Sequence, residues 1–275
     1  MSESPGSGEG FIESGDLSYP EIMAGLRSDF WKEIICYKSV DSTNERALVL
    51  PLKFPGAGAA IIADSQTKGR GRLGRVWVSP PGRNIYMSAL LAPEIALRDA
   101  ALLTVAATLA CVWALRNKTG LDVKVKWPND LMADGKKVGG ILTELRSVND
   151  RIKCAAIGIG ININTRTGDF PAALRSSATS VMAETGKCHS RSGVVSEVLN
   201  ELERWYRKLI YAGGFPLLEE WRKLSSTIGK GVRVTLYADV LSGLAEDIDE
   251  NGMLVLKLPS GERRRISAGD LTELR

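Results

Sequence analysis

Two short segments carry residue types that could bind and activate acidic groups. The first is a loop of alternating glycine and arginine whose positive charges are Lys68, Arg70, Arg72 and Arg75. Glycine lets such a backbone open and then close over an anion, and guanidinium groups bind phosphate through charge-assisted hydrogen bonds. The loop therefore indicates a phosphate-bearing ligand. A solvated basic loop or a nucleic-acid arm is the alternative, but no aromatic platform or basic stripe extends the cluster.

The same loop satisfies two better-known glycine patterns, and its surroundings exclude both. Residues 69–76 fit G-x-G-x-x-G and the glycine loop of protein kinases. A dinucleotide-binding loop opens a helix, whereas residues 76–78 are β formers. A kinase also needs His-Arg-Asp and Asp-Phe-Gly, but the single histidine, His189, precedes a serine, and Asp169-Phe170 precedes a proline.

The second segment, residues 126–130, reads Lys-Trp-Pro-Asn-Asp. It combines a cation at the end of a strand with a rigid proline turn and two side chains that carry oxygen atoms. Asn129 and Asp130 either fix this turn or bind the magnesium of a nucleotide, so no metal ligand is predicted. We expect Trp127, Tyr86 and Trp113 to pack in the core.

The elements that must position these segments follow from hydrophobic periodicity and turn residues. Strands are expected at 59–63, 76–78, 84–91, 123–127, 137–145 and 152–163, with turns at 134–135 and 149–150, and helices at 98–117, 194–211 and 216–224. The pattern predicts an α+β fold around a mixed or antiparallel sheet. From about residue 228, short β-type runs split by Asn251-Gly252 and by 259–261 predict a small all-β barrel.

Composition limits the class of protein. The 275 residues carry a net charge of +4 and are 44% apolar, which excludes a strongly basic nucleic-acid binder and a disordered chain. The longest apolar stretch, residues 100–115, reaches only about 24 Å as a helix, so no membrane span is predicted. No export signal is visible before Arg27, and residues 1–17 read as a flexible acidic tail.

The cysteines and the histidine are too few and too scattered for a zinc site. No C-x-x-C pair occurs among Cys36, Cys111, Cys154 and Cys188. Cys111 lies within the apolar helix pattern and is expected to be a buried, unreactive thiol. We therefore expect a reducing, cytoplasmic location, and we do not expect His189 to be catalytic.

Five ordered motifs together resemble the biotin–protein ligases. They are Asp41-Ser42-Thr43-Asn44, Gln66 with the arginine loop, residues 126–130, residues 137–144, and the run Gly158-Ile-Gly-Ile-Asn162-Ile-Asn164. The resemblance covers roughly residues 35–275. It implies a mixed-sheet catalytic domain flanked by helices (31–226) and an SH3-like C-terminal domain (227–275), and the composition of the N-terminus predicts a flexible acidic segment before them (1–30).

The resemblance implies a two-step, ATP-dependent and AMP-forming reaction. Biotin and MgATP give biotinyl-5′-AMP and pyrophosphate, and biotin then moves to a lysine of a biotin carboxyl carrier domain. ATP, Mg²⁺ and biotin are the ligands expected. The implied binding residues are Ser42, Thr43, Asn44, Gln66, Gly69, Gly71, Arg72, Trp77, Lys126, Gly140, Asn162 and Asn164.

Individual roles follow from the same resemblance. Ser42, Thr43 and Gln66 would hydrogen-bond the ureido ring of biotin, whose polar edge is costly to bury unmatched. Trp77 would stack on adenine, and Asn162 or Asn164 would bind the base edge. The catalytic residues would be Lys126, Arg72 and Arg70. A carboxylate attacking a phosphate meets repulsion, and a fixed cation beside both groups, here Lys126, would reduce it in each half-reaction.

Two other functions fit the sequence less well. A lipoate–protein ligase shares the fold and chemistry but lacks the Lys-Trp-Pro-Asn-Asp run in this form, and an inactive biotin or adenylate sensor would not need all the charged residues. About 30 residues precede the catalytic domain, fewer than the roughly 60 of a winged helix-turn-helix, so repressor function is not expected. The expected partner is the carrier domain, with no nucleic acid and no membrane, and a homodimer is left open.

Overall fold

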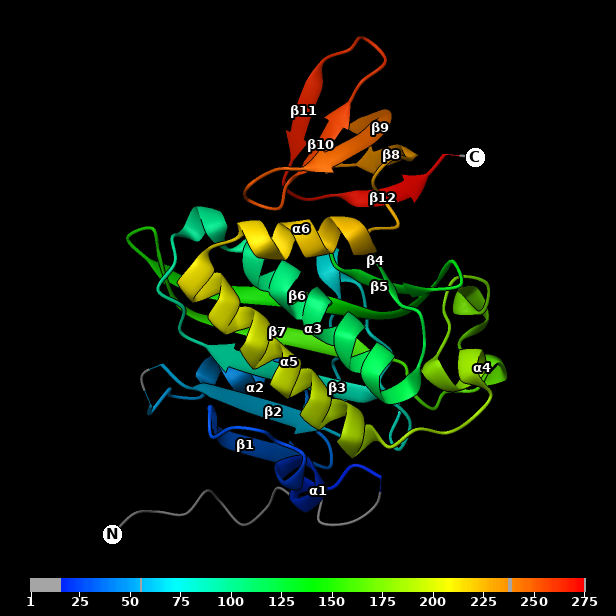
Figure 1. Ribbon diagram of the computed structural model, residues 1–275. Helices are drawn as coiled ribbons and strands as arrows, with labels where there is room; N and C mark the ends of the chain where they lie inside the picture. The colour runs from blue at the N-terminus through cyan, green and yellow to red at the C-terminus, as the bar shows by residue number, and fades with distance from the viewer. Residues whose placement is uncertain (1–15, 55, 237–238, 275) are drawn as a thin grey trace.

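The chain is built on a mixed seven-stranded sheet, seen edge to edge in Figure 1, in a computed structural model that describes residues 16–54, 56–236 and 239–274. In spatial order its strands are β1 (Trp31–Tyr37), β2 (Gly58–Ala63), β3 (Ile85–Leu91), β7 (Arg151–Ile161), β6 (Lys136–Val148), β5 (Asp130–Ala133) and β4 (Lys124–Lys126). β1 runs parallel to β2, and the other neighbouring strands are antiparallel. The predicted α+β class with a mixed sheet is confirmed.

Helices cover one face of this sheet, as Figure 1 shows. They are α3 (Ala101–Thr119), α5 (Arg191–Ala212) and α6 (Phe215–Leu224). α3 ends at Gly120, whose left-handed backbone (φ 72°) closes the last turn. β7 presents its isoleucines, 157, 159 and 161, to the core that includes α3 and α5. Because side chains alternate along a strand, Gly158 and Gly160 face the other way.

The remaining short elements lie at the edges of the sheet and in the loops. They are α1 (Tyr19–Ala24), α2 (Thr43–Val49), α4 (Val181–Thr185) and the 3₁₀ turns Arg72–Gly74, Leu97–Asp99, Thr167–Asp169 and Ala172–Leu174. α2 packs through Ala47 against a separate small cluster on the face that α3 leaves open. Its N-terminal end, Ser42 to Asn44, is therefore held against the sheet on that face.

The C-terminal unit is a small antiparallel sheet that fits an SH3-like domain. Its strands are β8 (Gly231–Thr235), β9 (Val240–Ile248), β10 (Leu254–Lys257), β11 (Arg263–Ile266) and β12 (Asp270–Glu273), in the spatial order β11-β10-β9-β8-β12. Figure 1 places this unit beside α6. Trp127 joins the two units, because its backbone N–H donates to Thr227 Oγ1 at 3.0 Å and its indole N–H to the Gly252 carbonyl at 3.2 Å.

Two expectations about local structure were wrong. Residues 76–78 form no strand: Val76 makes an isolated bridge with Arg70, and the segment closes the glycine–arginine loop instead. Residues 16–30, expected within the flexible segment, are folded, with Leu17 and Ile22 buried and α1 packed against α5. Burial of these apolar side chains outweighs the acidic, polar composition around them. Residues 1–15 of the expected tail lie outside the described residues.

The apolar helix and the cysteines are explained by burial. The segment Leu97–Thr119 is long and apolar enough to cross a membrane, longer than the sequence indicated, but 61% of its apolar window is buried inside the protein. It is the core helix that was expected. Cys111 is buried, and desolvation raises its pKa well above that of a free thiol, as expected for an unreactive cysteine. Cys36 is also buried, and desolvation raises its pKa to about 12.

Candidate active site

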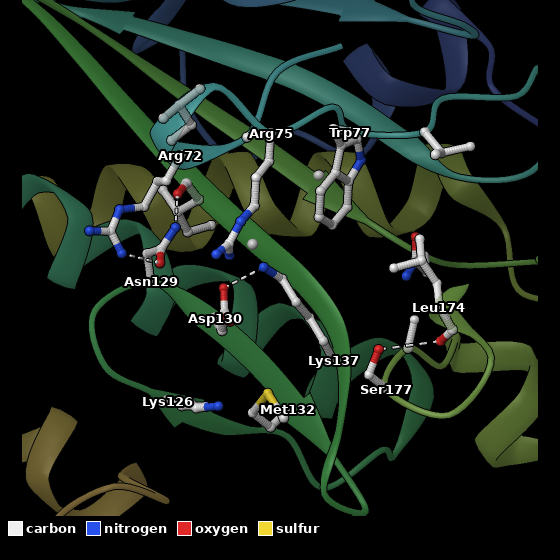
Figure 2. Close-up of a pocket in the computed structure, with 18 of the residues that line it drawn as sticks. Arg72, Arg75, Trp77, Lys126, Asn129, Asp130, Met132, Lys137, Leu174 and Ser177 are labelled. Atoms are coloured by element: carbon white, nitrogen blue, oxygen red, sulfur yellow. Dashed lines mark hydrogen bonds and ion pairs between the residues drawn. The ribbon is translucent and has the colours of Figure 1, made fainter. Parts of the chain in front are cut away.

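A cavity of about 1090 Å³ lies on the sheet face opposite α3 and α5. Strands β5, β6 and β7 contribute to its lining, together with the glycine–arginine loop, the 169–178 segment and residues 269–273 of the C-terminal unit. Figure 2 shows side chains from the glycine–arginine loop, β5, β6 and the 169–178 segment around it. Ligand cavities in proteins are typically about 300–1,000 Å³, so this one has room for a large ligand or for two smaller ones.

Glycines form the floor of the cavity. Gly140 of β6 and Gly160 of β7 are cross-strand partners, and Gly158 follows two residues along the same face. A Cβ on Gly160 would lie 2.6 Å from the Trp77 ring, and one on Gly140 would lie 3.2 Å from Lys137 Nζ. A Cβ on Gly158 would collide with the Asn44 amide. Because the glycines have no side chains, Trp77, Lys137 and Asn44 can lie directly on the sheet.

Hydrogen-bonding side chains occupy the end of the cavity beside Gly158. The Gln66 amide oxygen accepts the Thr43 backbone N–H at 2.9 Å, and the Ser88 hydroxyl lies 2.7 Å from Thr43 Oγ1 and 2.6 Å from Asn44 Oδ1. Ser42 is the N-cap residue of α2, yet its side chain makes no capping hydrogen bond. The cluster holds its own groups in fixed positions and leaves the Ser42 hydroxyl to a ligand.

Lys126 places an ammonium group in the lining that has no partner among the described residues. Lys126 ends β4, immediately before the Trp-Pro-Asn turn into β5, and lies opposite Asp130 in the sheet. Within the described part of the chain, no hydrogen bond or ion pair engages its Nζ. The turn is held by Asn129, which donates from its amide to the Ile141 carbonyl and accepts from Arg72 Nη1 at 3.2 Å.

The arginines of the loop differ in their partners. Arg70 lies between two carboxylates, at 3.2 Å from Glu45 and 3.1 Å from Glu144. Arg75 pairs with Asp270 of the C-terminal unit. Arg72 reaches Asn129 and, at 3.5 Å, the Gly269 carbonyl. The loop is therefore attached to α2, to the sheet and to the C-terminal unit.

Comparison with known proteins identifies the family. The profile of the Biotin/lipoate A/B protein ligase family matches residues 36–162, and that of the Biotin protein ligase C terminal domain matches residues 227–271. The Bifunctional ligase/repressor BirA of Bacillus spizizenii is 36% identical over 92% of this chain and 78% of its own length. The chain belongs to the biotin protein ligase family.

Further relatives agree with this assignment. The Biotin--[acetyl-CoA-carboxylase] ligase of Paracoccus denitrificans is 32% identical over 81% of this chain and 93% of its own length. The biotin protein ligase of Aquifex aeolicus, solved in complex with biotin and ATP, superimposes with a TM-score of 0.76 at 30% identity, covering 89% of this chain and 100% of its own.

Most residues that the sequence assigned to the site of this ligase do line the cavity. They are Ser42, Thr43, Asn44, Gln66, Arg70, Gly71, Arg72, Trp77, Lys126, Gly140 and Asn162. Asn162 lines it with one amide group already engaged, since its Nδ2 donates to the Thr179 carbonyl at 3.0 Å. The individual ligand contacts of these residues stay predictions.

Two predicted binding residues lie outside the lining. The Asn164 amide is spent on the chain itself, because it donates to the His189 carbonyl at 2.9 Å and accepts the His189 N–H at 3.0 Å. Gly69 instead allows close approach within the loop: a Cβ there would collide with the Trp77 carbonyl, and its own carbonyl accepts the Trp77 N–H at 2.9 Å. His189 also lies outside the lining, and its Nε2 is 2.8 Å from Thr185 Oγ1.

Several residues that shape the site have no role assigned to them from sequence. Ser88 and Glu144 hold Asn44, Glu144 also pairs with Arg70, and Lys137 pairs with Asp130. Strand alternation could have placed Ser88 and Glu144 on the same face as Gly158, since all three lie in neighbouring strands. No local signal connects Asp270 to a loop almost 200 residues earlier.

Proposed function

We propose that this chain activates biotin with ATP to biotinyl-5′-AMP and transfers biotin to one lysine of a biotin carboxyl carrier domain. One observation carries the proposal: a single cavity holds a fixed polar cluster at Ser42 to Asn44, an indole platform at Trp77 and an unpaired ammonium at Lys126. The cluster suits the ureido ring, the indole suits adenine, and the ammonium suits the two anions that must react.

In the first step a carboxylate oxygen of biotin attacks the α-phosphorus of ATP. The new bond joins that oxygen to phosphorus, and the bond to the β-phosphate breaks with its electron pair leaving on pyrophosphate. Lys126 would balance the negative charge shared by the two reacting groups, and Arg72 would help to cover the product. In the second step the carrier amine attacks the acyl carbon and forms a C–N bond. The single bond between that carbon and the oxygen bridging to phosphorus breaks, AMP leaves with its electron pair, and the amine loses a proton.

Magnesium would enter as part of the nucleotide. Mg²⁺ bound with phosphates usually needs only one or two protein carboxylates, because waters complete its shell. Within the described residues no group of three or more His, Cys, Asp or Glu side chains could hold a metal, but Asp130 lines the cavity. The residues present therefore fit an ion held mainly by the nucleotide, with Asp130 as one candidate carboxylate.

The reaction can be tested directly. The purified protein is incubated with ATP, labelled biotin and a biotin carboxyl carrier domain, and label on the carrier is measured. Covalent, ATP-dependent labelling is expected. Labelling that fails while the protein remains folded would contradict the proposed function and would favour a ligand-sensing role.

Biotin is favoured over lipoate because residues 227–271 match the profile of the Biotin protein ligase C terminal domain. Pyrophosphate release is measured with each acid in turn at equal concentration. Release with biotin and little with lipoate is expected, and the reverse preference would assign the chain to lipoate transfer.

The floor glycines provide a prediction that separates the two ends of the site. Gly160→Ala is expected to raise the KM for ATP about tenfold, since overpacking costs about 1–3 kcal/mol and the added methyl displaces Trp77. Gly158→Ala is expected to weaken biotin binding to a similar extent by displacing Asn44. Gly168→Ala, where nothing lies within 4 Å, is the control. Equal effects of the first two variants on both ligands would contradict this division.

A cytoplasmic location and the lack of nucleic-acid binding stay predictions, and the sequence predicts no particular oligomeric state. Sedimentation with and without biotin and ATP measures the oligomeric state. A footprint on operator DNA measures repressor activity, and no protection is expected at any salt concentration.

A further inference from the structure

Lys137 is a second lysine of the cavity whose backbone is fixed by the cavity wall. Its N–H donates to the Ser177 carbonyl at 2.8 Å, and its own carbonyl accepts the Thr179 N–H at 2.9 Å. These bonds join the start of β6 to the 174–179 segment, which also lines the cavity. The side chain must therefore leave the strand from a defined position at the mouth of the site.

The Lys137 side chain crosses the glycine floor. A Cβ on Gly140 would lie 3.1 Å from Lys137 Cε and 3.2 Å from Nζ, so a larger residue at 140 would push the chain aside. The ammonium then lies 2.5 Å from Asp130 Oδ1 and 5.5 Å from the centre of the Trp77 ring. Figure 2 shows Lys137 between these two groups, directed into the cavity.

Stability alone does not account for this arrangement. The Lys137 side chain is 34% exposed and that of Asp130 is 25% exposed, and ion pairs that contact solvent contribute little to folding. Holding a lysine across an open cavity also restricts a long, flexible side chain. A cation placed beside an indole face is instead suited to a ligand that has an aromatic ring joined to an anion.

We propose that Lys137 is a nucleotide-binding residue whose ammonium contacts the phosphate of the nucleotide while the base stacks on Trp77. This inference rests on the proposed function, because it assumes that ATP occupies this cavity. Only the ribose separates adenine from its α-phosphate, so an ammonium beside the indole is close to where that phosphate must lie. Asp130 keeps the ammonium in place and compensates its charge before the nucleotide binds.

Lys126 and Lys137 would then have different tasks. Lys126 makes no ion pair within the described chain and serves the reacting carboxylate and phosphate, whereas Lys137 has a carboxylate partner and serves nucleotide affinity. Loss of Lys137 should therefore change the KM for ATP much more than kcat, and it should leave biotin binding unchanged. Hydrogen bonds to charged groups support an expected rise in this KM of about tenfold to a hundredfold.

The test compares Lys137→Met, Lys137→Arg and Lys136→Met in the full chain. Lys136 is the preceding residue of β6 and lies outside the cavity lining, so it is the matched control. KM for ATP, kcat and the Kd for biotin are measured for each. Lys137→Met should raise the KM for ATP, Lys137→Arg should recover most of the loss, and Lys136→Met should behave as wild type.

Inhibition by AMP and by adenosine distinguishes the loss of a contact to the phosphate from a distortion of the nucleotide site. Lys137→Met should weaken inhibition by AMP and leave inhibition by adenosine unchanged. Equal weakening of both, or an unchanged KM for ATP, would overturn the role of Lys137 while wild-type labelling of the carrier still supported the ligase reaction. Wild-type protein that cannot form the adenylate would instead overturn the proposed function.

Discussion

Replacing Lys126 by methionine is expected to slow formation of biotinyl-5′-AMP by about 10²–10³-fold, the usual cost of removing one group that stabilises transition-state charge. Lys126 ends β4 at a turn that Asn129 and Trp127 hold in place, so its ammonium needs little reorganisation to act. Methionine retains much of the apolar stem and removes only the charge. The loss should therefore appear in kcat and not in folding.

The measurement separates the two half-reactions. Adenylate formation is followed by pyrophosphate release in single turnover, and transfer is followed with isolated biotinyl-5′-AMP and carrier. Both rates should fall, because the oxyanion of the second step forms close to the phosphate of the first. Lys153→Met, an exposed residue of β7, is the control. A Lys126→Met variant that forms adenylate at the wild-type rate would contradict the assigned role.

Strand alternation explains why the glycine floor of the site could be predicted from sequence. The contacts between this floor and the side chains that lie on it could not. In Gly158-Ile-Gly-Ile the isoleucines fill the helix-covered core and the glycines form the floor, so one run of residues serves both faces. The period of two was visible in the sequence. That the open face would hold Trp77, Lys137 and Asn44 depends on contacts with distant segments, which no local pattern contains.

The wrong predictions for Asn164 and for residues 76–78 each have a cause in the nearby backbone. Asn162 and Asn164 share a period of two, but β7 ends at Ile161, so the alternation no longer decides which one lines the cavity. Residues 76–78 have strand-forming side chains, yet Gly69 accepts the Trp77 N–H and thereby turns the segment back on the loop. At residues 76–78 this hydrogen bond within the loop overrides the intrinsic preference for a strand.

The acidic N-terminal segment shows the same effect at long range. Asp16 looked like part of a solvated tail, but Arg191 pairs with it across 175 residues of sequence. The Arg191 side chain is only 5% exposed and also reaches Asp64 at 2.6 Å and the Asn84 carbonyl at 3.2 Å. Burial alone would lower the pKa of this guanidinium, but the hydrogen bonds to Asp16 and Asp64 outweigh it and hold the pKa above its usual value.

Replacing Arg191 by leucine is therefore expected to lower the free energy of unfolding by about 3 kcal/mol, the lower end of the range for breaking a buried ion pair. The lower end applies because the Asp16 carboxylate, at 43% exposure, can be hydrated once the arginine is gone. The Asp64 carboxylate, at 20% exposure, bears more of the cost of being buried without a partner. Urea unfolding followed by tryptophan fluorescence measures the change. Asp16→Asn in the Arg191→Leu background should cost little more, since the pair is already lost.

Arg191→Leu should also disturb the shape of the cavity, because Arg191 contacts the Asn84 carbonyl and Asn84 lines the cavity. The Asn84 side chain accepts the Ile163 N–H at 3.0 Å and the Thr165 hydroxyl at 2.9 Å, so it sets the path of the chain beyond β7.

Arg98→Leu is the control for the stability measurement. It removes an arginine that is 82% exposed and 3.9 Å from its nearest carboxylate, and it should change the free energy of unfolding by less than about 0.5 kcal/mol. Equal losses for the two leucine variants would show that the Asp16–Arg191–Asp64 contacts do not stabilise the fold.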